Sequence, residues 1–247
     1  MLGSLKSLFR ANSKNVQQQH ASETAQRSNG LPVGMTPDDF NGLRLGGMVS
    51  LNMLSLKAFD SLNFDASWSG AAQQIAAVGV VELGQGEQLA RFYLENDTWI
   101  QASVANGKVF EYKLFDFLSS QHVSDLEFDG LINQPDNQTP AHPLGQRSFT
   151  LETDGDVQDD LKRYQRVWGA ENSEWSAPVV LEETVTRASD SGISQVTHHC
   201  MLYERQDQTS ERFEYILLSA EIEEQEGSYQ LVTSLGIDIS ALIIEAH

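Results

Sequence analysis

Runs of apolar residues that alternate with polar ones, separated by short polar turns, most constrain how this chain can fold. From about Ile75 onward, β-branched and aromatic residues recur in segments of strand length. No helical pattern long enough for a parallel crossover lies between these segments. We therefore predict a mainly β protein built from antiparallel sheets, either a sandwich or a partly open barrel, with a few short helices.

The predicted strands cover most of the chain. They are 48–56 (a strand or a short buried helix), 75–83, 88–94, 98–104, 108–117, 146–152, 162–168, 179–188, 195–205, 211–223 and 229–239. Asn106 and Gly107 predict a hairpin, because both residues tolerate a positive φ. A short helix is predicted near 125–133. A likeness between 89–93 and 161–165 leaves open an arrangement of two similar β halves.

Charge divides the chain into two parts. Residues 1–30 carry four basic residues against one acid, a net of +3, whereas residues 31–247 carry 12 basic and 34 acidic residues, a net of −22. We expect residues 1–30 to form a flexible basic arm and polar linker, and residues 31–247 to form one acidic β-rich domain. The proline-rich loop region 119–145 is a candidate boundary between two halves of that domain.

Residues 1–10 interleave Leu and Phe with Lys6 and Arg10, as an amphipathic helix does. Such a segment can lie on an anionic membrane surface, although so few cations make the contact weak. The alternatives are a frayed tail or a helix docked on the body. No apolar run approaches the roughly 20 residues of a transmembrane helix, so we expect no transmembrane segment.

The acidity of the domain makes nucleic acid an unfavourable partner, because binding to phosphate backbones depends on Lys and Arg. Cys200 is the sole cysteine of the chain, so no intramolecular disulfide can form and a reducing compartment fits. These observations predict a cytoplasmic protein.

No pattern in the chain predicts a cofactor site. Gly84-Gln85-Gly86 lacks the third glycine of a dinucleotide-binding loop and leads into a strand, so it is interpreted as a hairpin turn. The acidic segment 154–160 departs from a calcium loop at its sixth and twelfth positions. Carboxylate pairs such as Glu182–Glu183 are attributed to an acidic surface.

His198, His199 and Cys200 are the one cluster of soft metal ligands in the sequence. On a strand, His198 and Cys200 share a face and His199 points the other way. A zinc site would need further ligands from elsewhere. The alternative is that Cys200 is a small buried apolar residue.

Aromatic and cationic residues are densest around 162–175. Alternation places Tyr164, Arg166 and Trp168 on one face of a strand, and Trp175 follows. Two interpretations stay open: Arg166 has an internal partner within the acidic chain, or these four residues form a partner-binding site, in which Tyr, Trp and Arg are typically dominant.

Taken together, several segments resemble the YjfK-like bacterial proteins. They are Ile75 to Gly84, Leu89 to Tyr93, Trp99 to Gln101 and Tyr164 to Gly169, with Trp175 and Pro178. The resemblance covers about residues 40–240. It implies a bacterial cytosolic protein, with kinship to gene clusters for membrane-stress proteins of the phage-shock type. It supplies no catalytic residues, because the family has no established function.

The sequence thus favours a non-enzymatic module that binds another protein, with a link to membrane stress. The alternative is a hydrolase-like or metal-dependent enzyme that uses carboxylates and a site at His198 and Cys200.

Overall fold

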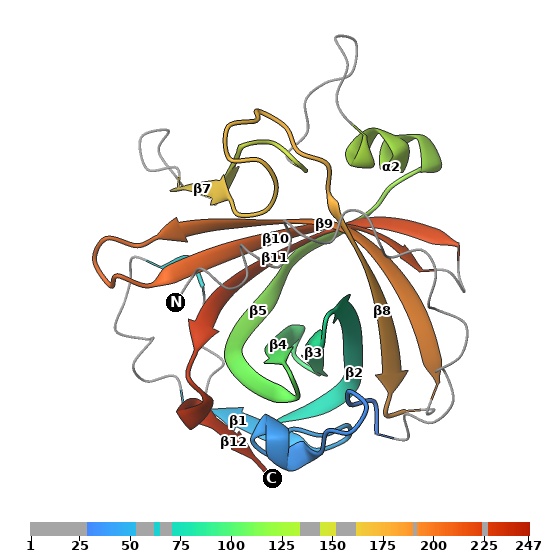
Figure 1. Ribbon diagram of the computed structural model, residues 1–247, viewed down its shortest axis with the longest axis vertical. Coiled ribbons are helices and arrows are strands. Elements are labelled where there is room, and N and C mark those ends of the chain that lie inside the picture. Colours follow the sequence, from blue (N-terminus) through green and yellow to red (C-terminus); the bar gives the residue numbers. More distant parts are fainter. Residues whose placement is uncertain are drawn as a thin grey trace.

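An antiparallel sheet that closes on itself forms the centre of the protein (Figure 1). The computed structural model describes residues 29–52, 62–64, 71–133, 144–151, 162–189, 192–223 and 227–247. Within these ranges eight strands make a barrel in the order β2-β3-β4-β5-β11-β10-β9-β8, and β8 closes it by pairing with both β9 and β2. The barrel strands are β2 (Gln73–Gly84), β3 (Glu87–Leu94), β4 (Thr98–Ala105), β5 (Lys108–His122), β8 (Val179–Arg187), β9 (Ile193–Gln206), β10 (Phe213–Glu223) and β11 (Ser228–Ile239).

Short elements cover the outside of the barrel (Figure 1). They are the 3₁₀ turn η1 (Pro37–Phe40), β1 (Met48–Leu51), helix α2 (Asp125–Ile132), β6 (Ser148–Leu151), β7 (Lys162–Arg166), the 3₁₀ turn η2 (Ala241–Ile243) and β12 (Ile244–Ala246). The β1–β12 pair extends the sheet beyond β2, and the β6–β7 ribbon joins the far end of β9. None of the helices in the described ranges has the length and apolar composition needed to cross a membrane.

Local chemistry explains where the elements begin and end. Asn106 and Gly107 both have positive φ, as the predicted hairpin between β4 and β5 requires. Ser124 caps α2 by accepting from the Glu127 backbone N–H, while the Glu127 carboxylate accepts from the Ser124 backbone. On the outer face, Phe40 of η1 packs edge-on against Phe92 of β3, with ring centroids 5.5 Å apart.

The predicted antiparallel β architecture is confirmed, and closure of the sheet selects the barrel over the sandwich. Residues 48–51 are a strand, whereas η1 and β12 were not predicted. The two segments that resemble each other, 89–93 and 161–165, fall on strands with different positions. Strand β3 lies in the barrel wall and β7 lies outside it, so they are not equivalent strands of two similar halves. Residues 1–28, 53–61, 134–143 and 152–161 lie outside the described residues. They contain most of the basic arm, the end of the predicted element 48–56, the centre of the proline-rich region and the acidic segment.

One glycine is required by the barrel interior. A Cβ on Gly79 of β2 would lie 1.6 Å from Oε1 of Glu183, which reaches across from the neighbouring strand β8. The absence of a side chain at this position therefore makes room for a buried carboxylate.

We predict that Gly79→Ala lowers the free energy of unfolding by about 3 kcal/mol or more, because the added methyl group forces the carboxylate away from its partners. Urea denaturation measures this change. Gly130→Ala is the matched control: its Cβ meets nothing within 4 Å on α2, so stability should be unchanged or raised by up to about 1 kcal/mol. Equal effects of the two substitutions would contradict the prediction.

Candidate functional site

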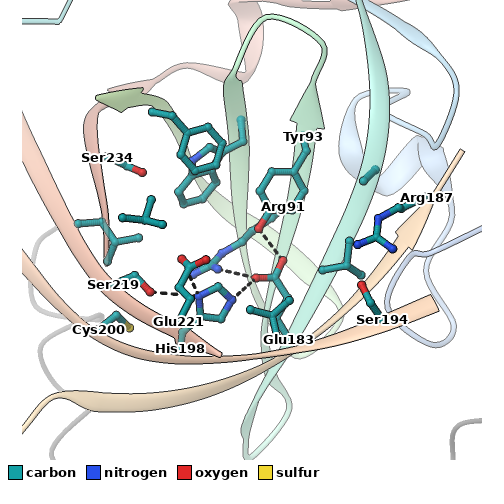
Figure 2. A pocket seen from close by; sticks show the side chains of 17 residues that line it. Arg91, Tyr93, Glu183, Arg187, Ser194, His198, Cys200, Ser219, Glu221 and Ser234 are labelled. Carbon is teal, nitrogen blue, oxygen red and sulfur yellow. Dashed lines mark hydrogen bonds and ion pairs between the residues drawn. The ribbon is translucent and has the colours of Figure 1, made fainter. Parts of the chain in front are cut away.

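A cavity of about 210 Å³ lies inside the barrel, toward the end at which β2, β4, β9 and β11 begin (Figure 2). Alternate side chains of every barrel strand point inward, so residues far apart in the sequence meet there. Part of the wall is apolar. The remainder contains a connected group of ionisable side chains, which we call the cavity cluster: Arg91, Tyr93, Glu183, His198 and Glu221.

Glu183 of β8 is the centre of the cavity cluster, and its carboxylate is completely buried. Oε1 accepts a hydrogen bond from the Tyr93 hydroxyl at 2.8 Å. Oε2 lies 2.7 Å from Arg91 Nη1 and 2.7 Å from His198 Nε2 (Figure 2). Three donors from two other strands therefore compensate the lost hydration of one carboxylate.

His198 of β9 bridges two carboxylates. Its Nε2 faces Glu183, and its Nδ1 lies 3.1 Å from both Glu221 Oε1 and Ser219 Oγ on β10. The register of the β9–β10 pair explains the contact between His198 and Glu221, because these two residues are direct partners across it. Both ring nitrogens are thus occupied.

The surroundings shift the pKa values of this cluster. Burial alone would lower the pKa of His198, but the Glu221 charge and the hydrogen bonds to Glu183 and Glu221 outweigh it and raise the pKa to about 9. Burial alone would raise the pKa of Glu183, yet Arg91 and His198 outweigh it and lower the pKa to about 2. At neutral pH the cluster therefore contains an imidazolium between two carboxylates, beside a guanidinium.

The predicted shared face of His198 and Cys200 is confirmed, because both line the cavity. His199 points outward and its ring meets Phe128 of α2 edge-on, with centroids 5.5 Å apart. The Cys200 thiol donates to the Val179 carbonyl at 3.5 Å, and burial raises its pKa to about 12. Among the described residues, no three His, Cys, Asp or Glu side chains are grouped so that they could hold a metal ion.

The residues predicted to bind a partner lie on or next to the β6–β7 ribbon, outside the barrel. Tyr164 is fully buried and donates to Glu214 Oε2 at 3.1 Å, and Trp168 is buried as well. Arg166 donates to the carbonyls of Gly145, Ala170 and Ser173 at 2.6–2.8 Å, while Trp175 is partly exposed. Arg166 thus has internal partners. A partner-binding role for these four residues stays a prediction.

Sequence reasoning missed most of the cavity cluster. Glu183 was attributed to an acidic surface, and this interpretation is wrong, since Glu183 is buried while its neighbour Glu182 is exposed. A signal was present in the strand pattern: Leu181, Glu183 and Val185 share one face of β8, and a single charge between apolar residues on a face is typical of a buried, paired group.

Comparison with known proteins places the chain in a family. The model of the family described as "Protein of unknown function (DUF2491)" matches residues 13–244. The chain belongs to the DUF2491 family. It is 25% identical to the uncharacterized protein YjfK of Escherichia coli (strain K12) over 206 residues, which cover 80% of this chain and 86% of that protein. The resemblance inferred from sequence is thereby confirmed, and the match reaches further into the basic arm than expected. No solved structure matches this DUF2491 protein.

We predict that Glu183→Gln lowers the free energy of unfolding by about 3–5 kcal/mol, because it leaves buried Arg91 and His198 without a full counter-charge. Chemical denaturation measures the loss. Glu182→Gln on the same strand is the control: this exposed residue accepts one hydrogen bond from Thr197, and its removal should change stability by no more than about 0.5 kcal/mol. If Glu183→Gln lowers the free energy of unfolding only slightly, the ion pairs of Glu183 with Arg91 and His198 are dispensable for stability.

We further predict that stability falls as the pH rises from about 6.5 to about 9. A raised pKa means that the folded state holds the His198 proton more tightly than the unfolded state does. Protonated His198 therefore stabilises the fold fully below pH 6.5, and this stabilisation is lost as the pH rises through the folded-state pKa of about 9. The loss should reach roughly 3 kcal/mol. His198→Gln should flatten the profile, whereas His199→Gln should retain it, because His199 is neutral in this range. Identical profiles for the two variants would refute the assignment.

Proposed function

We propose that this DUF2491 protein is a non-enzymatic binding protein that holds a small polar molecule in the barrel cavity. The observation that supports the proposal is the cavity itself, walled on one part by apolar side chains and on another by a connected set of charged ones. Ligand pockets commonly combine an apolar lining with a few fixed polar groups. At about 210 Å³ the cavity is smaller than most such pockets, which favours a small ligand.

The chemistry of the cluster favours binding over catalysis. A general base needs a free lone pair within reach of a substrate proton, but both nitrogens of protonated His198 are engaged with neighbouring oxygens. A nucleophilic cysteine needs a lowered pKa, and that of Cys200 is raised. The hydrolase-like or metal-dependent alternative at His198 and Cys200 is therefore the less favoured one.

A protein-interaction module is the second candidate. In the described part of the chain, β6 ends the strand order, and a strand at a sheet edge can pair with an extended peptide. Partly exposed Trp175 lies next to this ribbon, where Gln146 forms an isolated bridge with it. A link to membrane stress and a peripheral membrane contact through residues 1–10 are proposed from sequence alone.

Cavity binding predicts that small molecules stabilise the native chain but not a chain with a filled cavity. Ser234→Leu places a larger side chain on the cavity wall, and Ser120→Leu makes the same change at an exposed position on β5. Thermal unfolding is measured against a panel of small organic acids, amides, amines and polyols. At least one should raise the Tm of the wild type and of Ser120→Leu, as a ligand specific for the native state does.

The same compound should leave the Tm of Ser234→Leu unchanged. A panel in which no compound stabilises the wild type, or one whose effect survives in Ser234→Leu, would contradict the proposal. Cross-linking of the full chain to another protein that is lost in Trp175→Ala, and not in Ser234→Leu, would favour the second candidate.

A further inference from the structure

The last part of β5 has an edge that no described strand covers. Strand β4 pairs with β5 only as far as Asp116, and the backbone N–H of Phe117 then donates to the Asp97 carbonyl at 3.1 Å. Over residues 119–122, β5 continues beside β11 alone. Strand backbone groups point alternately to the two sides, so those of 119–122 that face away from β11 have no backbone partner in the described part of the chain.

Most of this edge lacks the usual protection against pairing. Every residue of 117–122 is exposed, including Phe117 at 38% and Leu118 at 46%. The segment is Phe-Leu-Ser-Ser-Gln-His and contains no Asp, Glu, Lys or Arg. Natural sheets commonly protect an open edge with Lys, proline or a bulge. Here the register shifts at Leu118, so a bulge protects the start of the segment and leaves 119–122 as a regular edge.

The surroundings of the edge are negative. The β3–β4 turn at its beginning contains Glu95 and Asp97, both exposed, and exposed Asp125 follows three residues beyond its end. Neither β11 nor α2 nor this turn contains Lys or Arg, and the chain has none between Lys113 and Arg147. An acidic peptide would therefore be repelled at both ends of the edge, whereas a peptide with basic residues at both ends would be attracted.

Charge also distinguishes between possible occupants. A second copy of the chain would pair its own β5 antiparallel, centred on Ser120, so that position 117 of one copy faces position 123 of the other. Asp97, whose carbonyl accepts from the N–H at position 117, would then approach Asp125 of the other copy, and each copy has a net charge of −19. Like charges that meet across an interface weaken it. A separate basic partner is therefore favoured over a second copy.

We propose that residues 119–122 of β5 form a docking site for an extended peptide of another protein, with Lys or Arg on both sides of an uncharged centre. The peptide pairs with the open edge as an additional strand, and backbone hydrogen bonds hold it there. Its basic ends lie near Glu95 and Asp97 at one end of the edge and near Asp125 at the other. This inference goes beyond cavity binding, does not depend on it, and concerns an edge other than that of β6.

Three synthetic peptides with blocked ends test the proposal: Lys-Thr-Val-Thr-Val-Thr-Lys, the same peptide with Glu in place of both Lys, and the Lys peptide with proline in place of both Val. Each is titrated into the full chain and followed by ¹H–¹⁵N NMR. The Lys peptide should shift the amide signals of 118–122 with saturation, the Glu peptide should bind at least about 10-fold more weakly, and the proline peptide should not bind. Hydrogen exchange of amides in 119–122 should slow at saturation, because they enter a new ladder.

Variants test the named residues. Asp97→Asn should weaken binding of the Lys peptide by about 3-fold or more, because Asn tolerates the positive φ of this position and removes its charge. Glu245→Gln is the charge-matched control, since exposed Glu245 lies on β12, five strands from β5 in the sheet order, and it should bind as the wild type does. Gln121→Lys should weaken binding by about 10-fold or more, whereas Gln121→Glu should not weaken it, which separates charge from side-chain size.

Four results would overturn the proposal. Equal affinity for the Lys and Glu peptides would contradict the basic partner. Saturable shifts on β6 and not at 118–122 would contradict the site. Slow exchange of the 119–122 amides before any peptide is added would mean that another segment or a second copy already covers the edge. The absence of saturable shifts with all three peptides would contradict docking altogether, and it would leave the Ser234→Leu test of cavity binding unaffected.

Discussion

Burial of the Glu183 carboxylate is the constraint on which the interior of this barrel depends. A charge without solvent is tolerated only where several donors replace its hydration shell. Those donors come from β3 and β9, while the room for the carboxylate comes from Gly79 on β2. The charge network therefore needs the barrel to be closed between β8 and β2, and the position of the carboxylate needs a glycine at position 79 of the neighbouring strand.

Most of the strands were predictable because their signals are local. Hairpins such as the one at Asn106 and Gly107 depend on residues that tolerate positive φ. Such residues can be identified from two neighbouring positions in the sequence. The shared face of His198 and Cys200 likewise follows from the period-two geometry of one strand. Helix α2 was predicted at its place, where Ser124 and Glu127 form a capping box.

The cavity cluster was not predictable, because it depends on which strands become neighbours. The pairing of β2 with β8 joins residues about a hundred positions apart, and no local pattern specifies it. Alternation places Glu182 and Glu183 on opposite faces, and the apolar neighbours Leu181 and Val185 indicate that the Glu183 face is enclosed. The pattern of one strand does not say which donors from other strands meet Glu183 there. An internal partner for Arg166 was one of the two interpretations left open, but the identity of the partners could not be predicted, because they are backbone carbonyls and every residue has one.

Buried charge is compensated differently at the two ends of the barrel interior. Away from the cavity, buried Lys113 lies 4.2 Å from the centre of the Tyr215 ring and pairs with Glu111 and Asp238, so one cation is matched by two partly exposed carboxylates. At the cavity end, Trp99 is stacked on Phe115 with centroids 4.3 Å apart, and the Arg91 guanidinium lies 5.0 Å from its ring. These contacts hold the indole in one orientation.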